Sequence, residues 1–302
     1  MMSSIPRFRP EKEPSVQQQH QHRGIKKGLY LIPSLFTALN ILMGFLAVMA
    51  SLRGFQMLVT GREADLTRAA NLFDSAAKAI GWAMVFDTLD GRIARMTKTA
   101  TEIGIQFDSI ADVLTFGIAP AVLAYTWGYG SAFHESTDAH KLGWFLSFMY
   151  LMCGAFRLAR FNVQATRPRA MAAGTVKVDK NYFLGLPIPM AAAGIAAIVH
   201  FAPQPLVQYG PRLATIYSSL MMVLIACLSA LMVSTLRYPS FKSVGTRRGS
   251  TRLVILLIAA VIMLVWLYSR YVLLALVTVY VLHGLLFRFW AIFHRSAEKE
   301  KA

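Results

Sequence analysis

The sequence has few charged residues and very little cysteine. Only 15% of its 302 residues are charged, whereas about a quarter are charged in ordinary soluble domains. This deficit excludes a water-soluble protein of this size. Both cysteines, Cys153 and Cys227, lie inside apolar runs, where they are typical of small buried hydrophobes. The histidines are scattered without metal-ligand spacing, so neither zinc nor thiol chemistry is expected.

Long apolar runs take the place of the missing charge. Hydrophobic residues make up 56% of the chain, and a bilayer-spanning helix needs about 20 mostly apolar residues. We therefore expect an all-α integral membrane protein with about eight transmembrane helices. The expected spans are 29–51, 69–92, 104–130, 142–162, 183–203, 213–236, 252–268 and 270–290.

The basic residues indicate how the chain is oriented. Residues 1–28 are polar, and we predict a disordered basic tail there. If this tail is cytoplasmic, 24 of the 31 lysines and arginines fall on the cytoplasmic side, as expected for a multi-pass protein of the inner membrane. Both termini would then be cytoplasmic. The net charge of +16 is explained by topology and by attraction to anionic lipids, so no nucleic-acid partner is expected.

Acidic residues are scarce, yet four of them lie close together. Asp87 and Asp90 are three residues apart near the end of the second expected span, and Asp108 and Asp112 are four apart near the start of the third. Both spacings place a pair on one helix face. A short loop joins the two helices, so they should be antiparallel neighbours. The two pairs can therefore converge at one depth, at the cytoplasmic edge of the membrane.

Converging carboxylates favour a metal site for phosphate chemistry. They repel one another and are costly to desolvate, and one or two divalent cations remove that penalty. Oxygen ligands favour Mg²⁺, Mn²⁺ or Ca²⁺. Gly91 and Gly104 let a ligand approach the helix backbone, and Arg95 is suited to a phosphate group. Each of these three residues alone could equally serve packing or topology.

The spacing of these residues resembles the motif of the CDP-alcohol phosphatidyltransferase family. The resemblance covers about residues 30–236. It implies a core of six transmembrane helices, often homodimeric, in which an alcohol displaces CMP from a CDP-linked donor with Mg²⁺ or Mn²⁺, and two ions are implied. The matching positions are Asp87-x2-Asp90-Gly91-x2-Ala94-Arg95-x8-Gly104-x3-Asp108-x3-Asp112.

Four further strings are similar to bacterial-type phosphatidylserine synthases of that family. One departure is Ser34 after Pro33, where relatives often carry Asn. This resemblance implies CDP-diacylglycerol as donor and L-serine as acceptor, whereas the metal motif alone leaves glycerol 3-phosphate and inositol open. The strings are IPSLFTALNILMGFLAV, RLARFNV, FLGLPIP and LMVSTLRYPSFK.

The resemblance also implies roles for single residues. Asp87, Asp90 and Asp108 would be metal ligands, and Asp112 would contact the metals and act as general base. Gly91, Arg95 and Gly104 would hold the CDP moiety. A set of polar residues at the end of the fourth span could bind the serine carboxylate or a donor phosphate, or could be topology anchors. This set is Arg157, Arg160 and Asn162.

Some features lie outside the motif. Asn40, inside the first span, could bond a neighbouring helix or contact substrate. Asp74 and Lys78 are four apart and are expected to form a structural pair. Residues 237–302 should add two helices and a basic tail to the core at 29–236. A transporter is the rival class, because buried acids can form ion pathways. However, the acids gather at one membrane edge, and no inverted repeat is evident.

Overall fold

The computed structural model describes residues 16–60, 62–97, 102–134, 136–166, 182–239 and 251–299. The expected all-α class is confirmed, since helices account for nearly all of these residues. The described strands, β1 (Tyr182–Leu184) and β2 (Arg237–Pro239), form a short antiparallel ribbon. The α-helices are α1 (Val16–Thr60), α2 (Glu63–Thr97), α3 (Glu102–Asp112), α4 (Ala119–Ala124), α5 (Asp138–Thr166), α6 (Ile188–Phe201), α7 (Pro211–Val233) and α8 (Thr251–Lys299).

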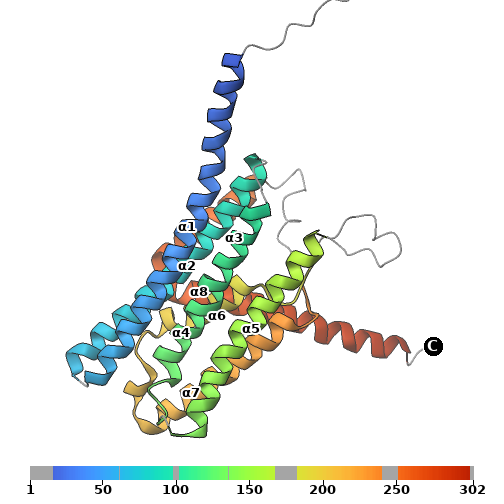
Figure 1. Cartoon of the computed structure of the whole chain (residues 1–302). Helices are drawn as coiled ribbons and strands as arrows, with labels where there is room; N and C mark the ends of the chain where they lie inside the picture. Colours follow the sequence, from blue (N-terminus) through green and yellow to red (C-terminus); the bar gives the residue numbers. More distant parts are fainter. Residues whose placement is uncertain are drawn as a thin grey trace, which may run out of the picture.

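The helices form a bundle around a continuous rod at residues 102–129. In this rod, α3 passes into the π-helical η1 (Val113–Ile118), then α4, then the π-helical η2 (Tyr125–Tyr129). A 3₁₀ turn, η4 (Leu206–Tyr209), links α6 to α7. Figure 1 shows α1, α2, α3, α5 and α7 running side by side, with α8 crossing their direction. The N-terminal part of α1 projects beyond the bundle.

The number of spans differs from the expected eight. Within the described residues, five helices are long and apolar enough to cross a membrane. α2 is long enough but too polar, because Asp74, Lys78, Asp87 and Asp90 interrupt its apolar surface. It packs against α1 and α6, where its polar groups meet partners. α6, with 14 residues, is short. The five segments are Leu35–Leu58, Ile103–Tyr129, Asp138–Val163, Pro211–Val233 and Ala259–His283.

The expectation for the N-terminal end was wrong over residues 16–28, whereas residues 1–15 lie outside the described part of the chain. α1 begins at Val16, so residues 16–28 are helical where a disordered tail was expected. Extending a formed helix needs no new nucleation, which allows the polar segment to continue the apolar span. The two helices expected after residue 237 are both present within α8 and meet at a kink at Tyr268 (φ −133°, ψ 44°), although no loop separates them. No glycine or proline lies near that point, so the chain lacks a turn signal.

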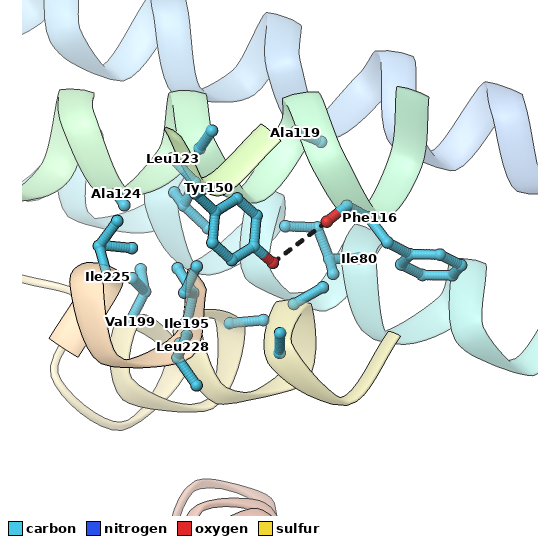
Figure 2. Packing of buried hydrophobic residues seen from close by; sticks show 14 of the residues in the cluster. Ile80, Phe116, Ala119, Leu123, Ala124, Tyr150, Ile195, Val199, Ile225 and Leu228 are labelled. Carbon is cyan, nitrogen blue, oxygen red and sulfur yellow. Dashed lines mark hydrogen bonds between the residues drawn. The ribbon is translucent and has the colours of Figure 1, made fainter. Parts of the chain in front are cut away.

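A dry core below the acidic residues fixes the helices relative to one another. Aliphatic side chains of α2, α4, α6 and α7 surround Tyr150 of α5 (Figure 2). The Tyr150 hydroxyl is fully buried and donates a hydrogen bond to the Phe116 carbonyl of η1 at 3.1 Å. This bond ties α5 to the π-helical segment that begins directly after Asp112. Such π-helical turns occur often at functional sites.

Candidate active site

Three of the four predicted aspartates converge. Asp87 lies near the end of α2, and Asp108 and Asp112 lie one turn apart on α3. One carboxylate oxygen from each of the three lies within 4.8 Å of the others. The convergence follows from the antiparallel arrangement of two helices whose acidic faces meet. The site thus has the oxygen-rich geometry that the spacing predicts.

The fourth aspartate, Asp90, turns toward α1. It is 5% exposed, and its carboxylate accepts a hydrogen bond from the Thr37 hydroxyl. It still interacts electrostatically with both Asp108 and Asp112. Asp90 therefore adds negative charge to the centre while α1 fixes its orientation.

Among the described residues, a buried arginine interacts with a carboxylate of the centre. Arg157 of α5 is 8% exposed and interacts electrostatically with Asp112. The Arg157 guanidinium by itself cannot neutralise four carboxylates, and the buried Asp112 Oδ1 atom has no hydrogen-bond partner among the described residues. Close carboxylates of this kind favour a hard divalent cation, and an all-oxygen donor set suits Mg²⁺ or Mn²⁺. The residues present therefore fit such an ion.

The residues predicted to hold the CDP moiety lie between the carboxylates and the α2–α3 junction. Gly91 follows Asp90 on α2 and is half-buried, and Gly104 is exposed on the first turns of α3. Their lack of side chains leaves the helix backbone approachable on that side. Arg95 belongs to α2, but its side chain lies outside the described residues.

The three predicted acceptor residues make different contacts in the structure. Arg157 is buried toward Asp112, whereas Arg160 Nη1 donates to the Val233 carbonyl at the end of α7, at 3.4 Å. Asn162 Nδ2 donates to the Ser109 hydroxyl at 2.8 Å, which joins the end of α5 to α3. Arg157 therefore interacts both with a carboxylate of the centre and with Arg160.

Sequence reasoning singled out Asn40 of α1 but missed the contact of Thr37 with the acidic centre. Thr37, Asn40 and Gly44 share one face of this helix, and Thr37 holds Asp90. Gly44 permits close approach to η1, because a Cβ atom there would lie 2.5 Å from the Thr115 hydroxyl oxygen. That hydroxyl donates to the Asn40 carbonyl at 3.2 Å. The spacing of polar and small residues within an apolar span was the available signal.

Comparison with known proteins identifies the family. The family model for CDP-alcohol phosphatidyltransferase matches residues 30–233. The chain belongs to this family. The match ends at Val233, the last residue of α7, so α8 lies beyond it.

Three relatives illustrate the range of the family members that this chain is similar to. A CDP-diacylglycerol–serine O-phosphatidyltransferase of Helicobacter pylori is 32% identical over 72% of this chain and 75% of its own length. A protein of the same name from Bacillus subtilis is 30% identical over 56% of this chain and 76% of its own. An archaetidylserine synthase of Methanothermobacter thermautotrophicus is 30% identical over 71% of this chain and 72% of its own.

The family assignment agrees with the position of the acids. The matched segment includes both helices that carry the aspartates and the face of α1 that contacts them. A multi-pass membrane enzyme that acts on a lipid needs its polar site to open at one membrane edge. The α2–α3 junction, the N-terminal part of α1 and the end of α5 lie at one end of the bundle (Figure 1), and the carboxylates lie toward it.

Proposed function

We propose that this enzyme transfers a phosphatidyl group from CDP-diacylglycerol to L-serine, giving phosphatidylserine and CMP. The convergence of Asp87, Asp108 and Asp112 carries the chemistry. The acceptor rests on the relatives, whose names all specify a serine lipid. The strings around Arg157 and Phe183 that resemble serine-specific enzymes point the same way.

Asp87, Asp108 and Asp112 would hold Mg²⁺ or Mn²⁺, with Asp90 adding charge or a further ligand. A bound ion, or a pair, stabilises the negative charge that develops on the phosphates during transfer. The buried, unpartnered Asp112 Oδ1 supports this assignment, because a buried polar atom usually has a partner.

The chain's own residues prepare the acceptor. Asp112 accepts the proton of the serine hydroxyl as its oxygen attacks the phosphorus that carries the diacylglycerol. The new serine O–P bond forms while the P–O bond to CMP breaks, and CMP leaves with the electron pair. Arg157 is placed to receive the serine carboxylate beside Asp112. Gly91 and Gly104 admit the donor phosphates to the helix backbone, and Arg95 supplies a cation for them.

The proposal includes the orientation of the protein in the membrane. The N-terminal part of α1 and the end of α5 lie at the same end of the bundle as the carboxylates and carry lysines or arginines, and basic segments favour the cytoplasmic side. The active site and both termini are thus assigned to the cytoplasmic face of the inner membrane, where anionic lipids attract the basic segments. The homodimer that the family resemblance implies stays a prediction.

An acceptor panel tests the substrate. Purified enzyme is incubated with CDP-diacylglycerol and serine, glycerol 3-phosphate or inositol, and both CMP and the lipid product are measured. We expect CMP release and phosphatidylserine with serine alone. Efficient turnover with glycerol 3-phosphate or inositol, and none with serine, would contradict serine as the acceptor. The proposed transfer of a phosphatidyl group from CDP-diacylglycerol would still stand.

A further inference from the structure

Asn40 is a buried polar residue of α1 that the reaction described above does not use. Its side chain is 0% exposed. Neither carboxamide atom, Nδ2 or Oδ1, has a hydrogen-bond partner among the described residues. Burial of an amide without partners is costly, and buried polar groups are rarely left in that state. We therefore expect the carboxamide to gain a hydrogen-bond partner when a ligand binds.

A purely structural role does not account for this arrangement. Polar side chains inside membrane spans commonly bond a neighbouring helix, as Thr37 does with Asp90. Asn40 takes part in a bond between helices only through its backbone carbonyl, which accepts from Thr115. Its carboxamide makes no hydrogen bond across this helix contact among the described residues.

Asn40 lies on the face of α1 that packs against Asp90 and η1. Thr37, one turn before it, contacts Asp90, and Thr115 contacts its own carbonyl. Asp112 precedes Thr115 by three residues on the same rod and faces the same side. Because helical side chains lean toward the N-terminus, Asn40 leans toward the level of Asp112. Asp112 Oδ1 is also buried without a partner.

We propose that Asn40 is a positioning residue for Asp112 in the metal-loaded site. Asn40 Nδ2 donates to the Asp112 carboxylate, and Asn40 Oδ1 accepts from a water molecule held at the ion. Ligating carboxylates are usually oriented by such hydrogen bonds. The inference rests on the metal centre of the proposed function and does not depend on which alcohol is the acceptor.

The test compares metal affinity with stability in two variants. Asn40→Leu removes both polar atoms at similar volume. Ser51→Ala is the matched control, because Ser51 is a fully buried polar residue of the same helix that bonds its own backbone, the Ala47 carbonyl, at 2.7 Å. Mn²⁺ affinity is measured by electron paramagnetic resonance on full-length protein in micelles without substrate. Thermal unfolding is followed in EDTA.

We expect Asn40→Leu to bind Mn²⁺ about 10- to 100-fold more weakly. Its unfolding temperature in EDTA should equal or exceed that of the wild type, because the variant loses a buried unpartnered amide. Ser51→Ala should retain wild-type affinity. Wild-type affinity in Asn40→Leu overturns the inference, and so does a lower unfolding temperature in EDTA, which would indicate a structural role. If the wild type itself binds no Mn²⁺, the metal centre fails and the inference fails with it.

Discussion

At the residue scale, the site depends on how four negative charges are distributed over different partners. Asp90 is held by Thr37, whereas Asp87, Asp108 and Asp112 face one another. Arg157 balances part of this charge. The centre is therefore prepared to gain binding energy from a cation, since repulsion among the carboxylates is relieved when the ion enters.

Replacing Asp108 with alanine should reduce turnover by about a thousandfold or more, because stabilisation by a bound ion supplies several kcal/mol to the transition state. EDTA should abolish activity, and Mg²⁺ or Mn²⁺ should restore it. The measurement is CMP release from CDP-diacylglycerol by purified enzyme. Full activity in the chelator, or in Asp108→Ala, would contradict the metal mechanism.

Arg157 and Arg160 should differ in their effect on the acceptor. A charge-assisted hydrogen bond to the serine carboxylate is worth about 1.5–3 kcal/mol, so Arg157→Ala should raise the KM for serine by roughly 10- to 150-fold. The KM for CDP-diacylglycerol should change less. Arg160→Ala is the matched control, because Arg160 contacts the Val233 carbonyl of α7.

Steady-state kinetics of both variants at saturating CDP-diacylglycerol measure the KM for serine and so test whether the two arginines differ. An unchanged KM for serine in a normally inserted Arg157→Ala protein would place the acceptor site elsewhere. An equal rise in both variants would instead restore the interpretation in which the two arginines act together.

At the element scale, a hydrogen-bond network of Asp74, His200 and Ser269 joins α8 to the rest of the protein. Asp74 of α2 pairs with Lys78 at 2.7 Å, which confirms the structural pair expected from their spacing. Asp74 also contacts His200 Nδ1 of α6 at 2.5 Å, and His200 Nε2 contacts the Ser269 hydroxyl of α8 at 2.9 Å. Ser269 directly follows the kink at Tyr268. This hydrogen-bond network therefore fixes α8 at its kink.

Ser269→Ala should lower the free energy of unfolding by about 0.6 kcal/mol, the average for a hydrogen bond between membrane helices. His200→Leu should cost more, because it removes contacts to both α2 and α8. Unfolding in mixed micelles with increasing SDS measures both values. Ser219→Ala is the control, since this exposed serine bonds its own helix at the Thr215 carbonyl. Equal stability of all three variants would show that the network of Asp74, His200 and Ser269 does not hold α8 in place.

At the scale of the whole molecule, the arrangement separates two chemical environments. The carboxylates lie toward the α2–α3 junction. The hydrogen-bond network of Asp74, His200 and Ser269 lies further along α2, away from that junction. Exposed apolar side chains cover α8, including Trp266 and Met263. These surfaces suit contact with lipid.

Cysteine labelling should locate the two ends of the bundle. Met96, near the end of α2, is 83% exposed, and Ser136 lies before α5 at the opposite end of the rod 102–129. With Cys153 and Cys227 replaced, a cysteine at position 96 should react only from inside the cell and one at position 136 from outside. The reverse pattern would refute both the orientation and a cytoplasmic active site.

The sequence by itself determined the membrane class and the meeting of the acidic helix faces. Both depend on local regularities: apolar runs long enough to cross a bilayer, and spacings of three and four that place side chains on one helix face. The pairing of Asp74 with Lys78 follows from the same periodicity. Such features need no knowledge of how the helices pack.

The tertiary structure alone decided which distant side chains meet. Thr37 reaches Asp90 across 53 positions, and His200 reaches Asp74 across 126. Arg157 interacts electrostatically with Asp112 while Arg160 bonds α7, although the two arginines are three positions apart on one helix. These outcomes depend on the rotation of each helix about its axis. The packing of large and small side chains against neighbouring helices sets that rotation, and the spacing within a single helix does not record it.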